Sequence, residues 1–348
     1  MGWFTRYVRT SRCRSAAWAL LLSCTLQAIC APGFTADLVV GNGPGASFRL
    51  PSAAAAAARP GDTVHILPGT YYDCAVWQTD NVTIEGSGEA TRITDRICQG
   101  KAVFVVTGRN VRIRNLTLAR ARHLDGHGAA IRAEGRNLSL DGVLIENNQD
   151  GVFAPGLAGG MLRIERSTFR TNGATPGSTP SAAVRAGPLD ALLIRDTVFE
   201  DGQGKAAILS AAGWTALEDC SIGGGTRLEG AAVVVEGGLR AVRNRVEAGS
   251  GPRGYRAAIL ALPSDNAQPL SVTNNQLEGN GLLLLNWSGQ DMRLAENRVP
   301  PDAMEASSEG AWWYALRQEL RSTWQNLSGG AREAIRVLRR LVDVATAG

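Results

Sequence analysis

The densest group of reactive side chains lies in the segment 119–128, which reads ARARHLDGHG. Two of the protein's three histidines are here, His123 and His127, with Asp125 between them. An imidazole exchanges a proton near neutral pH, and a neighbouring carboxylate can orient its ring. We therefore expect His127 or His123 to act as base or acid and Asp125 to orient it. The alternative is a solvated loop that turns at its Asp-Gly pair.

Two arginines and a phenylalanine take the same position in the short runs AAIRA, GVFA and AAVRA. Aligning the runs predicts one outward column of Arg132, Phe153 and Arg185. Elimination or epimerisation of a uronic acid needs a cation beside the carboxylate and a base for the adjacent proton. Arg132 is therefore a candidate catalytic residue that binds the carboxylate. Arg185 and Phe153 are candidate substrate-binding residues.

Asp150, in the run ENNQDGV, is a further candidate for substrate binding. Together with Asp125 it offers the carboxylate pair that glycosidic hydrolysis requires. The alternative for Asp150, as for Asn147 and Asn148, is a corner of a structural repeat, because the same slot recurs in other repeats.

A repeat of two apolar residues five positions apart must position these side chains. It recurs at intervals between 22 residues, from Val272 to Leu294, and 31 residues, from Ala241 to Val272. Each interval also holds a short run of small and β-branched residues, and none holds a helical pattern. The repeat predicts an all-β parallel β-helix of about nine coils over residues 37–300. The residues expected at its corners are Asn115, Gly142, Ser167, Asp196, Asp219, Asn244, Asn274 and Asn297.

The ends of such a solenoid need cover. Ser52–Arg59 reads SAAAAAAR and predicts an N-terminal helical cap. Residues 301–348 have a different composition and predict a C-terminal helical hairpin, which either packs on the solenoid or binds a membrane surface or a partner. Its apolar residues at helical spacing are Trp313, Leu316, Leu320, Trp324, Leu327, Ala331, Ile335, Leu338 and Val342.

Residues 1–36 are typical of a cleavable signal peptide, with basic residues up to Arg14 and an apolar run over Ala16–Ala31. The alternative is an uncleaved anchor, for which this run is short. We expect export to the periplasm or the medium and no transmembrane span in the mature chain. The signal segment carries four arginines and no acid, and so accounts for the formal net charge of +4. The near-neutral remainder gives no reason to expect nucleic-acid binding.

Three cysteines follow the signal segment, Cys74, Cys98 and Cys220. An oxidising compartment permits pairing, and a Cys74–Cys98 disulfide would close the first coil and contribute roughly 3 kcal/mol. Cys220 lies in a strand pattern and is expected to be free and buried. No cysteine spacing resembles a zinc site, so no metal site is expected. The sequence assigns no cofactor and no oligomeric state.

The stretch AAARPGDTVHILPGTY, which ends at Tyr71, and the runs IRNLTLARAR and LIENNQDGVFA resemble pectin-lyase-like right-handed parallel β-helix proteins. The resemblance covers roughly residues 45 to 300 and implies right-handed coils. That superfamily includes polysaccharide lyases, epimerases and glycoside hydrolases, so the resemblance implies an exported protein that acts on or binds polysaccharide. The alternative is a non-catalytic glycan-binding or envelope-structural solenoid. The sequence lacks the Asp-Pro-His run of alginate epimerases and the dense aspartates with which pectate lyases bind calcium.

Overall fold

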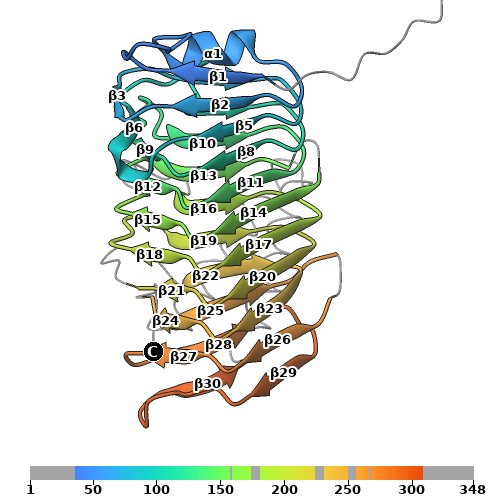
Figure 1. Cartoon of the computed structure of the whole chain (residues 1–348). Helices are drawn as coiled ribbons and strands as arrows, with labels where there is room; N and C mark the ends of the chain where they lie inside the picture. Colours follow the sequence, from blue (N-terminus) through green and yellow to red (C-terminus); the bar gives the residue numbers. More distant parts are fainter. Residues whose placement is uncertain are drawn as a thin grey trace, which may run out of the picture. The chain divides into compact units, whose positions relative to one another are not determined.

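The computed structural model describes residues 36–156, 159–173, 181–223, 231–249, 256–265 and 268–308. Their short parallel strands wind into a solenoid with three sheets (Figure 1). The ten strands of the third sheet give about ten coils, one more than expected. The signal-peptide prediction lies outside the described residues, except for Ala36.

The strands follow each other around the solenoid from the first sheet to the second and the third. The first sheet contains β1 (Asp37–Val40), β2 (Thr63–Ile66), β5 (Thr83–Glu85), β8 (Arg112–Arg114), β11 (Leu138–Asp141), β14 (Met161–Glu165), β17 (Ala191–Arg195), β20 (Trp214–Glu218), β23 (Gly238–Val242), β26 (Leu270–Thr273) and β29 (Met292–Ala295). The second contains β3 (Gly69–Tyr71), β6 (Thr91–Thr94), β9 (Thr117–Ala119), β12 (Leu144–Glu146), β15 (Thr168–Arg170), β18 (Val198–Glu200), β21 (Ser221–Ile222), β24 (Arg245–Glu247) and β27 (Gln276–Glu278). The third contains β4 (Ala75–Trp77), β7 (Ala102–Val106), β10 (Ala129–Ala133), β13 (Asp150–Ala154), β16 (Ala182–Ala186), β19 (Ala206–Ser210), β22 (Ala231–Glu236), β25 (Ala257–Leu262), β28 (Leu282–Asn286) and β30 (Met304–Ser307).

The five-residue repeat is confirmed as two inward rows. Its first members stack in the first sheet, where Leu140 pairs with Ile113 on one side and with Ile164 on the other. Its second members stack in the second sheet, where Ile145 lies between Leu118 and Phe169. All of these side chains are buried in one apolar core. The repeat therefore fixes both the strands and their register.

The corner between the first and second sheets has a positive φ in successive coils, as at Asn115 (53°) and Gly142 (61°). Five of the eight expected corner residues occupy this slot. Ser167, Asn244 and Asn297 were placed one residue wrong, because the residues with positive φ are Arg166, Arg243 and Glu296. The three displaced side chains instead bond to neighbouring coils. Asn244, for example, donates to Asn275 over 2.9 Å, and Asn275 donates to Asn297 over 3.1 Å.

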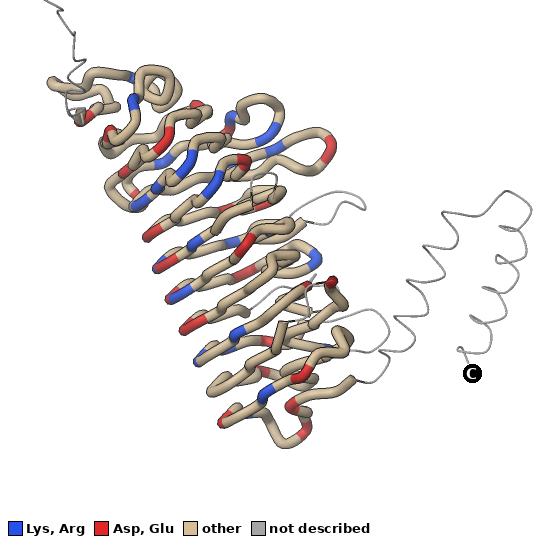
Figure 2. Tube along the Cα trace, turned by 90° about the vertical axis from the view of Figure 1, so that its right-hand side faces the viewer, with Lys and Arg blue, Asp and Glu red and all other residues tan. Residues whose placement is uncertain are grey.

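Charged residues repeat from coil to coil along the solenoid (Figure 2). Many of them pair between neighbouring coils, as Arg114 does with Glu85 at 2.8 Å and Arg166 with Asp141 at 2.5 Å. These pairs are largely exposed and contribute little individually. Because each pair joins two neighbouring coils, the pairs nevertheless favour the observed register of one coil on the next.

The helix α1 (Pro51–Ala57) lies at the N-terminal end of the solenoid and contacts β1 and β4 (Figure 1). It ends earlier than expected because Pro60 disfavours a helical Arg59. A short 3-10 helix, η1 (Gly88–Ala90), precedes β6. At the other end, the expected boundary at residue 300 was wrong, because β30 pairs with β28 and extends the third sheet to Ser307. The residues patterned as a helical hairpin, from Trp313 onward, lie outside the described part.

The predicted disulfide between Cys74 and Cys98 is confirmed, and Cys220 is free and buried, also as predicted. Burial raises the pKa of the Cys220 thiol to about 12, so this thiol is unreactive at neutral pH. In the described part of the chain, no helix has the length and apolar character that a membrane crossing requires.

Candidate functional site

The predicted column is present on the outer face of the third sheet. Phe153 of β13 pairs with Arg132 of β10 and with Arg185 of β16, and the column continues to Leu209 of β19. The Arg132 guanidinium carbon lies 4.0 Å from the centre of the Phe153 ring, and that of Arg185 lies 3.5 Å from it. Because β13 lies between the two other strands, the guanidinium groups flank the ring. The ring is therefore committed to the arginines and is not a free platform for a sugar.

Both arginines also have acidic partners. Arg185 donates to Asp150 over 2.6 Å, and only 1% of the Asp150 side chain is exposed. Arg132 donates to Glu134 over 3.2 Å, and Lys101 donates to the same carboxylate over 2.8 Å. A substrate carboxylate would therefore have to compete with acids of the protein for these cations.

Asp150 is the first residue of β13 and lacks the positive φ of a corner residue, so the corner interpretation was wrong for this residue. Desolvation by burial raises the pKa of Asp150, although the neighbouring Arg185 opposes the effect. Asn147 does have a corner conformation, with a φ of 55°, and Asn148 is fully buried. The Asp150 carboxylate contacts Arg185 and the Ala182 backbone N–H, so its bonds tie β13 to β16.

The loop between β9 and β10 carries the two histidines, and its arginines fasten it to neighbouring coils. Arg120 pairs with Asp95 of the preceding coil. Hydrogen bonding from Arg120 holds the pKa of Asp95 below its usual value of 3.8. Arg122 donates to the backbone and side-chain oxygens of Asn147, each over 2.5 Å. These two arginines are therefore anchors of the loop.

Gln149 of the next coil holds both ends of the histidine segment. Its side-chain oxygen accepts the backbone N–H of His123 over 2.7 Å and that of Gly128 over 2.8 Å. Its side-chain nitrogen donates to the His123 carbonyl over 3.0 Å. Gln149 is 5% exposed, so a buried amide with three hydrogen bonds fixes the position of the loop. Sequence reasoning did not find this residue, because nothing in the run ENNQDGV distinguishes it.

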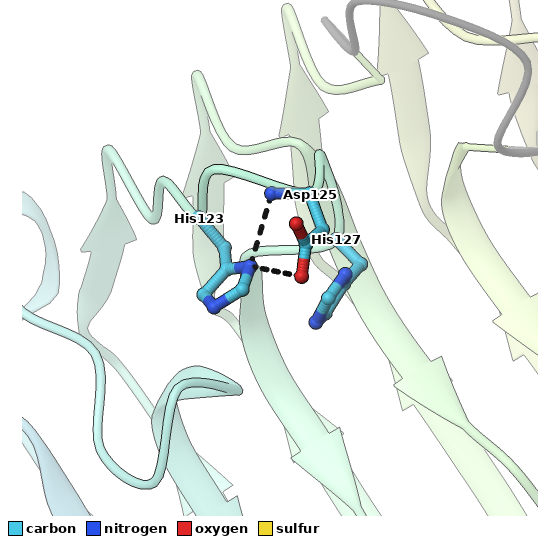
Figure 3. Close-up of side chains that lie close together, drawn as sticks. All are labelled: His123, Asp125 and His127. Atoms are coloured by element: carbon cyan, nitrogen blue, oxygen red, sulfur yellow. Dashed lines mark hydrogen bonds and ion pairs between the residues drawn. The ribbon is translucent and has the colours of Figure 1, made fainter.

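His123, Asp125 and His127 lie together on this loop (Figure 3). The ring centres of the two histidines are 4.3 Å apart. Nδ1 of His123 accepts the backbone N–H of Asp125 over 3.2 Å and lies 3.6 Å from Oδ2 of the same residue. Asp125 therefore contacts His123. One candidate ligand atom from each of the three residues lies within 4.8 Å of the other two.

The cluster has two chemical uses. Its imidazoles and carboxylate can act together as an acid–base group, which is the expectation from the sequence. Two imidazoles and a carboxylate are also a common set of ligands for a divalent cation. The sequence did contain a signal for metal binding, the alternation His-x-Asp-x-His, although it contained no metal-binding spacing of cysteines.

No protein-family profile and no curated protein matches the sequence. Solved structures do match. Pectate lyase Pel9A superposes with a TM-score of 0.55 at 16% identity over 79% of each chain. A mutant of the PL6 alginate lyase AlyGC gives 0.50 at 14% identity, over 78% of this chain and 39% of that chain. A pectin methylesterase from Aspergillus niger gives 0.46 at 15% identity, over 80% of this chain and 91% of that chain. The chain thus has the right-handed parallel β-helix fold of Pel9A and AlyGC.

Proposed function

We propose that the protein is exported and acts on an acidic polysaccharide where the loop 123–128 leads into the outer face of the third sheet. The observation that carries the proposal is the cluster of His123, Asp125 and His127, fixed to the next coil by buried Gln149. A pre-positioned acid–base group is the main requirement for proton transfer to or from a sugar.

The fold supports a polymeric substrate. Pel9A and AlyGC are named as lyases of pectate and alginate, which are acidic polysaccharides, and they share this solenoid. Stacked sheets offer an extended, rigid surface that matches the length of such a chain. The Cys74–Cys98 disulfide supports export, because such bonds persist in oxidising compartments.

In the proposed elimination, His127 takes the proton adjacent to the sugar carboxylate, the bond between the ring and the glycosidic oxygen breaks, and His123, oriented by Asp125, gives that oxygen a proton. The carboxylate is neutralised near Arg132, which then exchanges part of its contact with Glu134 for the substrate. Arg185, Phe153 and Asp150 hold Arg132 and its strand in place.

The second candidate is a non-catalytic solenoid that binds glycan or supports the envelope. It is favoured by the contacts within the column, where Arg132, Phe153 and Arg185 interact with one another and with protein acids. Such saturation is typical of a structural stack.

A panel of acidic glycans tests the proposal, with absorbance of unsaturated uronate and release of reducing ends as readouts. His127→Ala should lower turnover by roughly a hundredfold, the usual contribution of an acid–base group. His65→Ala is the matched control, because His65 lies in β2 of the first sheet. No product from any glycan, with binding retained, would support the second candidate. Full turnover in His127→Ala would place the reaction elsewhere.

Arg132→Ala separates a role in binding from a role in folding. If Arg132 binds the substrate carboxylate, the variant should melt close to the native protein and lose turnover. Loss of folding would assign Arg132 to the structural stack with Phe153 and Glu134.

A further inference from the structure

We propose that His123, Asp125 and His127 bind one divalent cation of the Zn²⁺ type. The inference does not depend on the polysaccharide, because it rests on the ligand geometry of the loop alone. No cysteine takes part, which is why a search by cysteine spacing did not reveal the site.

The backbone directs the three side chains to one place. They alternate along the chain, and the His123 carbonyl accepts the Gly126 N–H over 3.0 Å, which closes a turn between them. Gly126 has a φ of 78°, a conformation that favours glycine. Leu124 is fully exposed, whereas both imidazoles are partly buried. The turn therefore sends the apolar side chain outward and gathers the polar ones.

The contacts of His123 leave two candidate ligand atoms, its own Nδ1 and a carboxylate oxygen of Asp125, close to each other. Its Nδ1 accepts a backbone N–H and so presents a lone pair, without a proton of its own. The Asp125 carboxylate oxygen stands 3.6 Å from that nitrogen, which is beyond hydrogen-bonding distance. The Nδ1 lone pair and the carboxylate oxygen thus lie close enough for one cation to bind both.

The distances suit one small ion. Two ligands on tetrahedral Zn²⁺, each with a bond of about 2.1 Å, lie about 3.4 Å apart. The separation of 3.6 Å between His123 Nδ1 and Asp125 Oδ2 is close to this value. The third ligand, from His127, is within 4.8 Å of the others, so a rotation of its partly buried ring completes the set. Binding exchanges the hydrogen bond at Nδ1 for a coordination bond.

The surroundings hold the ligands in position before the ion arrives. The side chain of Gln149 accepts the backbone N–H groups of His123 and Gly128 and so fixes both ends of the ligand segment. Such supporting contacts raise the affinity of a metal site because less freedom is lost on binding.

His65 provides an internal contrast. Its Nε2 lies 3.2 Å from Asp37 and its Nδ1 lies 3.7 Å from Glu85. The two acids therefore address opposite nitrogens of one ring and do not converge on a single point. This histidine has acidic neighbours but no geometry for an ion, which makes it a matched control.

Three protein ligands leave at least one position of the ion open for water or a carboxylate oxygen. This position would supply a positive charge that no acid of the column has already neutralised, unlike Arg132 and Arg185. With the ion bound, a metal-bound water would replace His127 as the proton acceptor of the proposed reaction, because both imidazoles are then ligands.

The test uses the full mature chain without a polyhistidine tag and with its disulfide oxidised. A chelator first removes any metal, and the protein is then titrated with ZnCl₂ in a calorimeter. One equivalent should bind. His123→Ala, His127→Ala and Asp125→Asn should each weaken binding by roughly tenfold or more. His65→Ala should bind as the native chain does. Melting curves should show that every variant is folded, and the visible spectrum with Co²⁺ should show a four-coordinate band that the His123→Ala variant lacks.

No binding of Zn²⁺ by the native chain would overturn the proposal. So would binding that persists in a variant with all three residues replaced, or that is lost in His65→Ala. Failure of the glycan panel alone leaves the calorimetry intact, so the two proposals stand or fall separately.

Discussion

The third sheet has two different outer faces along the same column. On β10, β13 and β16 the column consists of Arg132, Phe153 and Arg185, linked by stacking and ion pairs. From β19 to β28 the same positions hold Leu209, Val234, Leu260 and Leu285 in continuous register. The backbone is the same in both regions. The solenoid therefore sets where an outward side chain stands but leaves its chemistry to the sequence.

The late region forms an apolar cluster separate from the solenoid's interior. It includes Ala231, Ala257, Leu282 and Leu285, and Leu285 is only 2% exposed although its column faces outward. An outward apolar stripe requires cover. The early region thus has polar groups that are paired with one another, and the late region has an apolar surface that suits another piece of protein.

The largest expected effect is in the early region. Asp150→Ala removes the carboxylate that accepts from Arg185 and from the Ala182 backbone N–H, and breaking such a largely buried pair costs about 3 kcal/mol or more. Urea unfolding should show this loss. Asp141→Ala, which breaks an exposed pair with Arg166, should cost less than about 1 kcal/mol. If both variants lose the same free energy of unfolding, the Asp150–Arg185 pair contributes no more than an ordinary surface pair.

Leu285→Ala tests the late region. Its side chain is buried, so truncation should cost about 2 to 3 kcal/mol. Leu209→Ala changes the same column at a partly exposed position and should cost clearly less. If the two variants melt together, the late stripe has no cover at Leu285.

The predicted hairpin is the cover that we expect for the late cluster. Deleting residues 309–348 retains β30 and should lower the melting temperature or the solubility. Leu285→Ala should then cost less in the shortened chain than in the full one, because the coupled contact is already lost. An unchanged melting transition would refute docking and favour a free partner-binding segment.

The smallest expected effect is on the pH dependence of stability, and it should be similar in the early and the late coils. Bonds from Arg120 and Arg243 lower the pKa of Asp95 and Asp219, respectively, below 3.8. A lowered folded pKa contributes stability that is present above the unfolded value and is lost as pH falls through the folded value. Asp95→Asn and Asp219→Asn should therefore each destabilise slightly at pH 7 and have no effect in strong acid. Melting temperatures measured over a range of pH test both variants. A large effect in only one of them would show that the early and late coils also differ at their corners.

The sequence was sufficient for the strands, their register and the outward column, because the repeat encodes all three. The prediction of corner residues failed at Ser167, Asn244 and Asn297, because two adjacent positions at each corner both accept small polar residues. One slot needs a positive φ, and the other needs a side chain that bonds to the next coil. The extra coil was missed because β1 and β2 precede the first five-residue pair.

The candidate site was predictable in part. Density and spacing identified His123, Asp125 and His127, which the structure brings together. Alternation from β10 into the next residue also predicts Glu134 as a partner of Arg132 on the same face, and the structure has this pair. The anchoring by Gln149 needed coordinates, because it depends on where one coil lies over the next.

Pairing only between adjacent coils has a consequence for how the chain folds. Each inner strand of the three sheets bonds to the strand one coil earlier and to the strand one coil later, so strand pairing among the described residues does not wait for a distant part of the sequence. A newly made coil therefore finds its template already formed by the coil before it. Folding can proceed in the order of synthesis or translocation, from the disulfide-closed first coil toward β30.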